Sequence, residues 1–118
     1  MTVITPVDFV SAVQALIPTS GAWVQGYDAK DVSGKSVSFE TPTATRFSLY
    51  GALKRINFTH HADSAKERHS FVLVVKQINI EIKKIHSKAS IKNYNDRPST
   101  TYANVMTILS NTKTSLGG

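Results

Sequence analysis

The stretch FVLVVKQINIEIKKI, residues 71–85, decides the fold of this chain. Its apolar residues recur four, three, four and three positions apart, which places them on one side of a helix. They are Phe71, Val75, Ile78, Ile82 and Ile85. A strand is the alternative, because seven of the fifteen residues are valine or isoleucine. Lys76 and Lys84 interrupt the alternation that a strand requires, and no glycine or proline divides the run, so the sequence predicts one helix.

A second apolar pair, Leu73 and Ile80, lies nearly opposite this stripe on the same helix. A helix with apolar residues on two sides needs cover on both. The sequence therefore leaves two interpretations open. The helix is the central element of the core, or Leu73 and Ile80 form an interface with a partner or with a second copy of the chain.

The remaining elements are predicted outward from this helix. They are a helix over 7–17 capped by Thr5, two extended runs over 23–27 and 37–39, a helix over 44–56 capped by Thr41 or Thr43, and a last helix over about 100–111. Gly51 makes the second of these helices thin, so a neighbouring backbone, such as that of the central helix, is expected to pass close to it. The predicted fold is mainly α, a bundle of about four helices with a short β hairpin or extended pair after the first helix.

Length and composition fit a single soluble domain. A chain of 118 residues is large enough to bury about two thirds of its unfolded surface, so residues 1–118 are expected to form one globular domain with flexible ends at 1–4 and 113–118. The absence of cysteine excludes disulfides, zinc–thiolate sites and thiol nucleophiles. No signal peptide or membrane-spanning run is recognisable, and a cytoplasmic protein is expected.

The positive charge is unevenly distributed. The net charge is +6. The segment from Lys54 to Arg97 contains ten basic and four acidic residues, whereas the rest of the chain contains four of each. The surplus favours an acidic partner, although a small domain can carry such charge for solubility alone. The candidate partner-binding residues lie on the central helix and after it; they are Lys76, Lys83, Lys84, Lys88 and Lys92.

Three separate stretches carry motifs of a known family. They are Trp23-x-Gln25-Gly26, Arg46-Phe47-Ser48-x-x-Gly51-Ala52-Leu53 and Tyr94-Asn95-Asp96-x-Pro98. In order and spacing they resemble the uncharacterised bacterial and phage domain family DUF6197, whose patterns read Trp-x-Gln-Gly, Arg-Trp-Cys-x-x-Gly-Ala-Leu and Trp-Asn-Asp-x-Pro. The resemblance implies a mostly helical cytoplasmic domain, often phage-borne, with no established activity. Ser48 replaces the family's cysteine, so no chemistry of that thiol is available here.

Two motifs that suggest ligand chemistry are better explained as loops. Residues 29–36 fit a relaxed phosphate-binding loop, but the extended run that follows offers no helix N-terminus to bind the phosphates. His60, His61, Asp63 and His69 do not have the spacing of a zinc or iron site. We therefore expect no metal site, no cofactor and no catalytic residues.

One polar cluster precedes the last helix: Tyr94, Asn95, Asp96 and Arg97. Together with Arg46, these side chains could hold a small anion or a base. The alternative is a capping cluster, in which Asn95 or Asp96 caps the last helix and Arg46 or Arg97 pairs with Asp96. The caps available at this helix start are Asn95, Asp96, Ser99 and Thr100.

The function expected from the sequence is that of a non-enzymatic accessory protein, phage-encoded, which binds an acidic host or defence protein through its basic surface. Nucleic-acid binding is the first alternative, but there is no recognition-helix motif and aromatic residues do not alternate with the basic ones. A small ligand-binding domain or enzyme centred on Arg46, Ser48, Asn95 and Asp96 is the second.

Overall fold

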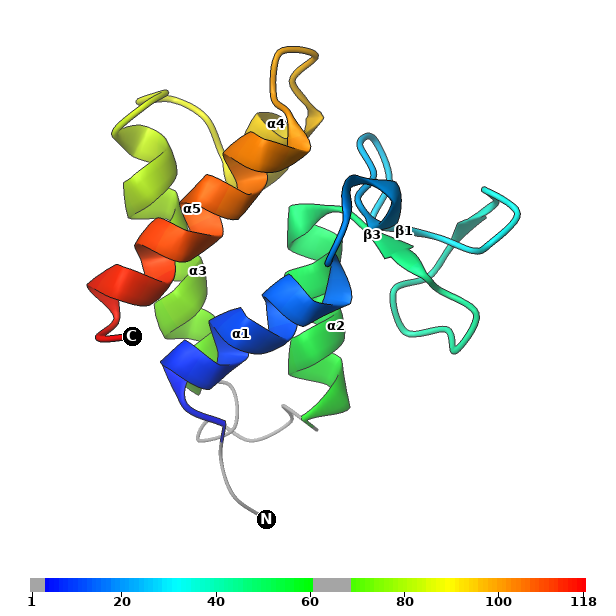
Figure 1. The fold of residues 1–118 in the computed structure, drawn as a ribbon, viewed down its shortest axis with the longest axis horizontal. Coiled ribbons are helices and arrows are strands. Elements are labelled where there is room, and N and C mark those ends of the chain that lie inside the picture. The colour runs from blue at the N-terminus through cyan, green and yellow to red at the C-terminus, as the bar shows by residue number, and fades with distance from the viewer. Residues whose placement is uncertain (1–3, 61–68) are drawn as a thin grey trace.

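The computed structural model describes residues 4–60 and 69–118, and these form five α-helices and a small sheet (Figure 1). The helices are α1 (Pro6–Leu16), α2 (Leu49–Thr59), α3 (His69–Lys83), α4 (Ile91–Asp96) and α5 (Tyr102–Ser115), with a 3₁₀ turn, η1 (Ser20–Ala22), after α1. The strands are β1 (Ala29–Lys30), β2 (Ser36–Val37) and β3 (Arg46–Phe47). The predicted mainly helical fold with a hairpin after the first helix is confirmed.

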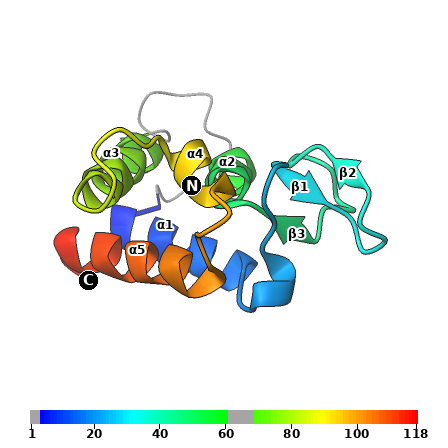
Figure 2. The same cartoon turned by 90° about the horizontal axis from the view of Figure 1, so that it is seen from above.

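The helices form two layers with the core between them. Helices α1 and α5 make one layer, and α2, α3 and α4 make the other, with the sheet at one end (Figure 2). Helix α3 packs against α5, α1 and α4. The largest fully buried side chains come from both layers and include Phe9, Phe47, Leu49, Leu53, Ile78, Ile82, Ile108 and Leu109. The predicted central helix therefore carries much of the core.

The buried face of α3 is rotated relative to the prediction. Ile78 and Ile82 are fully buried as expected, but Phe71 and Val75 are only half-buried. Ile85 lies beyond the end of α3 and is 56% exposed, so its assignment to the buried stripe is wrong. The other buried residues of α3 are Ser70, Val74 and Glu81.

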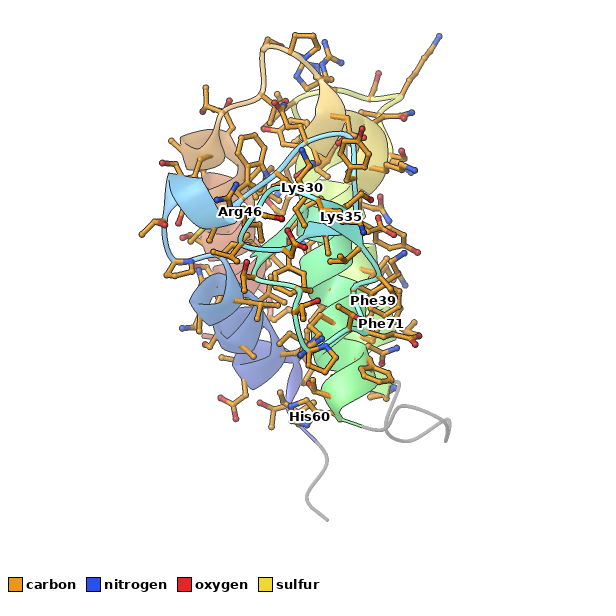
Figure 3. The ribbon with its side chains drawn as sticks, turned by 90° about the vertical axis from the view of Figure 1, so that its right-hand side faces the viewer. Lys30, Lys35, Phe39, Arg46, His60 and Phe71 are labelled. Atoms are coloured by element: carbon orange, nitrogen blue, oxygen red, sulfur yellow. The ribbon has the colours of Figure 1, made fainter. Side chains whose placement is uncertain are left out.

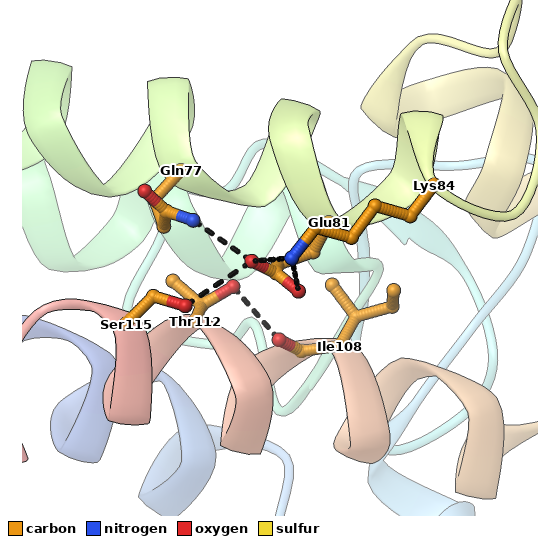
Figure 4. A network of polar contacts seen from close by, with 6 residues as sticks. All are labelled: Gln77, Glu81, Lys84, Ile108, Thr112 and Ser115. Carbon is orange, nitrogen blue, oxygen red and sulfur yellow. Dashed lines mark hydrogen bonds and ion pairs between the residues drawn. The ribbon is translucent and has the colours of Figure 1, made fainter.

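Polar partners explain this rotation. The Ser70 hydroxyl donates to the backbone carbonyl of Ile4. Glu81, 4% exposed, accepts hydrogen bonds from Gln77 Nε2 at 2.8 Å and from Ser115 Oγ at 3.2 Å (Figure 4). The Lys84 ammonium lies 3.2 Å from both carboxylate oxygens. Burial alone raises the pKa of Glu81, but these hydrogen bonds and the Lys84 charge outweigh it and hold the pKa below its ordinary value.

The first helix forms as predicted. Pro6 occupies its first turn, and Thr5 Oγ1 accepts a hydrogen bond from the Asp8 amide at 3.1 Å. Its inner face is buried against the other helices through Phe9, Val10, Val13 and, just beyond the helix, Ile17.

The stretch that fits a phosphate-binding loop is a hairpin turn between β1 and β2. The Asp31 carboxylate accepts hydrogen bonds from the Ser33 amide at 2.9 Å and the Lys35 amide at 3.0 Å. Gly34 adopts φ +89°, which a residue with a side chain rarely adopts. A third strand, unexpected from the sequence, pairs with the other edge of β1 and gives the order β2-β1-β3.

The predicted start of the second helix is wrong. Helix α2 begins at Leu49, not Ala44, and Ser48 is its cap, with Oγ accepting from the Gly51 amide at 3.0 Å. The preceding residues are extended because Arg46 and Phe47 pair with β1. Neither predicted cap, Thr41 or Thr43, serves this helix.

A neighbouring backbone does pass close to Gly51, but it belongs to the chain before β1 and not to α3. A Cβ placed on Gly51 would lie 1.9 Å from the carbonyl oxygen of Asp28. Only glycine fits at this contact, because backbone atoms cannot move aside as the end of a side chain can.

The region before the last helix also differs from the prediction. Residues 91–96 form α4, capped by Ser90, whose Oγ accepts from the Asn93 amide at 3.1 Å. Helix α5 begins at Tyr102, and Thr101 and Asn104 form a reciprocal capping box. Residues 113–115 continue α5, and the Gly118 amide donates to the Lys113 carbonyl at 2.9 Å.

No helix in the described ranges is long and apolar enough to cross a membrane. His61 and Asp63, proposed and rejected above as metal ligands, lie outside those ranges.

The close contact at Gly51 makes a testable prediction. Gly51→Ala is expected to lower the free energy of unfolding by about 2–3 kcal/mol, because the new methyl group overlaps the Asp28 carbonyl and overrides the helix preference of alanine. Gly21→Ala is the control, because the nearest atom to its new Cβ would be 3.8 Å away. Urea denaturation of both variants measures the difference, and equal effects would contradict the contact.

Glu81→Gln tests the buried carboxylate. It is expected to lower the free energy of unfolding by about 1–2 kcal/mol at pH 7, because the charge-assisted bond from Lys84 is lost. A carboxyl whose pKa is lowered by folding stabilises the protein above its ordinary pKa of 4.5, and this contribution disappears as the pH falls through the lower folded-state value. The two proteins should therefore converge in stability in acid.

The exposed Glu40 provides the control for this measurement, and Glu40→Gln should change the free energy of unfolding by less than about 0.5 kcal/mol. A stability difference between wild type and Glu81→Gln that persists unchanged from pH 7 down to acid would show that the carboxylate charge is not what stabilises this contact.

Candidate functional site

Asn95 lies at the centre of the polar cluster predicted from the sequence, and it is fully buried. Its Oδ1 accepts hydrogen bonds from Trp23 Nε1 at 2.6 Å and from the Leu49 amide at 3.0 Å. Its Nδ2 donates to the Val24 carbonyl at 3.1 Å and to Asp96 Oδ1 at 2.9 Å. A side-chain amide has two acceptor and two donor positions. All of them are used by this chain.

Gln25 and the backbone amide of Gly26 add further hydrogen bonds between the loop before β1 and the end of α4. Gln25 Nε2 donates to the carbonyls of Asn95 at 2.9 Å and Arg97 at 2.8 Å. The Gly26 amide donates to Asp96 Oδ1 at 2.8 Å. We call Trp23, Gln25, Asn95 and Asp96 the clasp. It joins the loop before β1 to α4 across about seventy residues of sequence.

The clasp corrects the capping prediction. Asn95 and Asp96 do not cap α5, whose cap is Thr101. Asn95 instead accepts the amide of Leu49, the first residue of α2. The expected ion pair of Asp96 with Arg46 or Arg97 does not form, although all three residues are described. The Asp96 carboxylate receives the Gly26 amide and the Asn95 amide group instead.

The structure brings together only part of the proposed ligand constellation. Ser48 and Asn95 meet at the start of α2, where each accepts a backbone amide of that helix. Arg46 is on β3, opposite Lys30 of β1, at the sheet end of the molecule seen in Figure 3. No hydrogen bond within the described chain joins Arg46 to the clasp.

Tyr94 and Arg97 flank the clasp residues Asn95 and Asp96 in the sequence. Tyr94 is buried, and its ring centroid is 5.7 Å from that of His86. Burial raises the pKa of the Tyr94 hydroxyl, which the positive charge of Arg97 partly opposes. Arg97 is exposed and lines, with His86 and Lys88, a shallow hollow of about 460 Å³. Tyr94 therefore anchors α4, whereas Arg97 faces solvent.

The five candidate lysines are all exposed, but they differ in their surroundings. Lys76 and Lys83 project from α3, Lys88 from the connection after it and Lys92 from α4. Lys84 pairs with the buried Glu81 at 3.2 Å, so its charge serves the α3–α5 contact.

Three of these lysines border a hollow of about 750 Å³ between α3 and residues 88–90. Its apolar lining residues are Phe71, Val72, Val75, Ile80 and Ala89, and its lysines are Lys76, Lys83 and Lys88. We call this hollow the α3 groove and its apolar lining residues the floor of the groove. Val72 is 57% exposed and Ile80 is 42% exposed, so the floor is open to solvent. A smaller hollow of about 320 Å³ shares Val75, Asn79 and Ser90 with it and adds Lys92.

Leu73 and Ile80, predicted to form one interface, lie in different surroundings. Ile80 lines the α3 groove, whereas Leu73 is half-buried and does not line it. Sequence reasoning also missed Val72, the more exposed residue of the floor. It missed the roles of Trp23 and Gln25 in the clasp as well. The signal that could have indicated this contact is that the Trp-x-Gln-Gly and Asn-Asp motifs occur together in one family.

In residues 4–60 and 69–118, no three histidine or acidic side chains lie close enough together to hold a metal ion.

Asn95→Asp tests the clasp. The new carboxylate oxygen would face the Val24 carbonyl and the Asp96 carboxylate in a buried site, so the free energy of unfolding should fall by about 3 kcal/mol or more. Asn93→Asp, on the same helix and exposed, should change it by less than about 0.5 kcal/mol. Urea titration followed by Trp23 fluorescence measures both, and a small effect of Asn95→Asp would contradict the saturated network.

Comparison with known proteins identifies the family. A family model described as "Family of unknown function (DUF6197)" matches residues 1–114. No match to the chain was found among curated proteins or among solved structures. The match covers nearly the whole chain and agrees with the resemblance carried by the motifs. The chain belongs to the DUF6197 family, a family of unknown function.

Proposed function

We propose that this protein is a non-enzymatic binding module whose lysines on and beside α3 take an acidic protein partner. The observation that carries the proposal is the α3 groove, where Lys76, Lys83 and Lys88 surround an apolar floor open to solvent. None of the described residues that line it is acidic. Positive charge around exposed apolar surface is complementary to a protein surface that carries carboxylates around apolar side chains.

The composition of the floor favours a protein over nucleic acid. Single-stranded nucleic acid is bound by aromatic rings that stack on its bases, with cations along its backbone. The floor of the α3 groove is mainly aliphatic, with Val72, Val75 and Ile80, and its one aromatic residue, Phe71, is half-buried. Aliphatic side chains gain most from burial against other apolar side chains.

The two buried polar side chains at the start of α2 support a non-enzymatic function. Asn95 and Ser48 are buried, and each uses its side chain to bind backbone amides of α2. A catalytic group must reach a substrate or exchange a proton with it. Side chains committed to the start of a helix are poorly placed for either task.

The proposal includes the setting that the family resemblance implies. The protein would act in the cytoplasm of a bacterium, and the gene would be carried by a phage. The partner that we propose for it there is a host or defence protein. The basic surface would then attract the partner at long range before the apolar floor is buried.

Capture from a bacterial lysate tests the proposal with two matched double variants. Lys76→Glu with Lys83→Glu reverses charge at the α3 groove, whereas Lys35→Glu with Lys113→Glu reverses the same number of charges elsewhere. The groove variant should retain about tenfold less of a captured acidic protein than wild type, because the charge attraction becomes repulsion. The control variant should retain it.

Nuclease treatment and salt separate the alternatives. Capture that disappears with nuclease, and falls steeply with added salt, would replace the proposal with nucleic-acid binding. Equal capture by both double variants would show that the lysines of the α3 groove are not the binding surface.

A further inference from the structure

We infer that the α3 groove is the docking site for an amphipathic helix of the partner, with an aliphatic ridge and acidic flanks. This inference rests on the proposed function and adds to it the form of the bound segment. A helix laid in a groove buries apolar side chains at positions i, i+3, i+4 and i+7 and leaves its flanks to meet the rim.

The groove has the length that such a helix needs. Its lining follows α3 from Phe71 to Lys83, a distance of about 18 Å at the rise of an α-helix. Residues 88–90 form its opposite wall, and the smaller hollow continues it toward Lys92. More than three turns of a partner helix can therefore lie along α3.

The floor is unusually exposed for a helix of the core. Val72 and Ile80 are 57% and 42% exposed, whereas Val74 and Ile78 on the opposite side of α3 are fully buried. Helix α3 thus has apolar residues on two sides, and the described residues of the chain cover only one of them. Aliphatic residues left in contact with water along one groove indicate a surface that is buried when a partner binds.

The positions of the lysines specify where the partner's acids lie. Lys76 and Lys83 are seven residues apart, which is two turns along the same side of α3. Carboxylates spaced seven residues apart on a helix packed along α3 would face both. Lys88 lies on the opposite wall and favours a further carboxylate on the other flank of the partner helix.

The same charges disfavour a second copy of this chain as the occupant. A symmetric contact between two α3 grooves would place Lys76 and Lys83 of one copy against those of the other. Like charges brought together at an interface oppose association, and none of the described residues lining the groove is a carboxylate that could compensate them.

A peptide selection on the full chain tests the inference. A displayed library of random peptides of about 16 residues, long enough to span the groove as a helix, is selected on the immobilised protein. The enriched peptides should show apolar residues at helical spacing with aspartate or glutamate on both flanks. Peptides synthesised from these sequences are then titrated by fluorescence anisotropy.

Two aliphatic variants locate the binding site. Ile80→Asp places a negative charge on the floor and should weaken the selected peptides by about tenfold or more. Val32→Asp, at a residue 79% exposed in the hairpin turn, should leave binding unchanged. Melting curves show whether each variant is folded, and if Ile80→Asp is not, Lys83→Glu on the exposed rim serves in its place.

Each outcome decides the inference. If acidic peptides bind wild type and Ile80→Asp equally, the α3 groove is not the docking site, and the inference is overturned. The proposal that the partner is acidic would still stand. Enrichment of no acidic peptide would overturn both. A dimer of the protein in solution that Ile80→Asp abolishes would assign the groove to a second copy and overturn the inference, as would selective binding of single-stranded DNA there.

Discussion

The buried amide of Asn95 is the contact on which the arrangement of this molecule depends. It joins three segments that are remote in sequence, the loop at Trp23 and Val24, the start of α2 and the end of α4. The sheet beside it consists of three strands of two residues each, which cannot be stable on their own. The clasp therefore fixes the sheet to the helices. Loss of this one side chain would leave an indole, a backbone amide and a carbonyl unpaired in the interior, so the network is expected to form or break as a unit.

Helix α3 presents two surfaces that the chain treats differently. Its inner side is buried through Ile78, Ile82 and Glu81. The ammonium of Lys84 pairs with the buried Glu81 carboxylate. Its outer side leaves Val72 and Ile80 exposed between lysines. The motif residues Trp23, Gln25, Ser48, Asn95 and Asp96 make hydrogen bonds within the fold, and the partner surface that we propose lies outside the motifs. This division is the physical basis for our proposal that the α3 groove binds a partner, whereas the clasp holds the fold together.

The sequence predicted those parts of the fold that depend on local pattern. The helix over 71–85 was predictable because the burial of its aliphatic residues outweighs their preference for strands. Its exact rotation was not, because Ser70 and Glu81 find their partners at Ile4 and Ser115, far along the chain.

The start of α2 was missed because the pairing of β3 with β1 is a tertiary contact. Asn95 or Asp96 was predicted to cap the last helix, but local sequence cannot show that the Asn95 side chain instead accepts the amide of Leu49, forty-six residues earlier. Likewise, exposed lysines were predictable, whereas the α3 groove requires residues 88–90 to fold back beside α3.

Hydrogen exchange of the Trp23 indole N–H under native conditions tests the central role of the clasp most directly. This is the one tryptophan of the chain, so its indole proton gives a single resonance. If the hydrogen bond to Asn95 breaks only when the molecule unfolds, the free energy of exchange will equal the free energy of unfolding measured with denaturant. An exchange free energy several kcal/mol smaller would show that the clasp opens locally while the helices stay folded, and it would contradict this account.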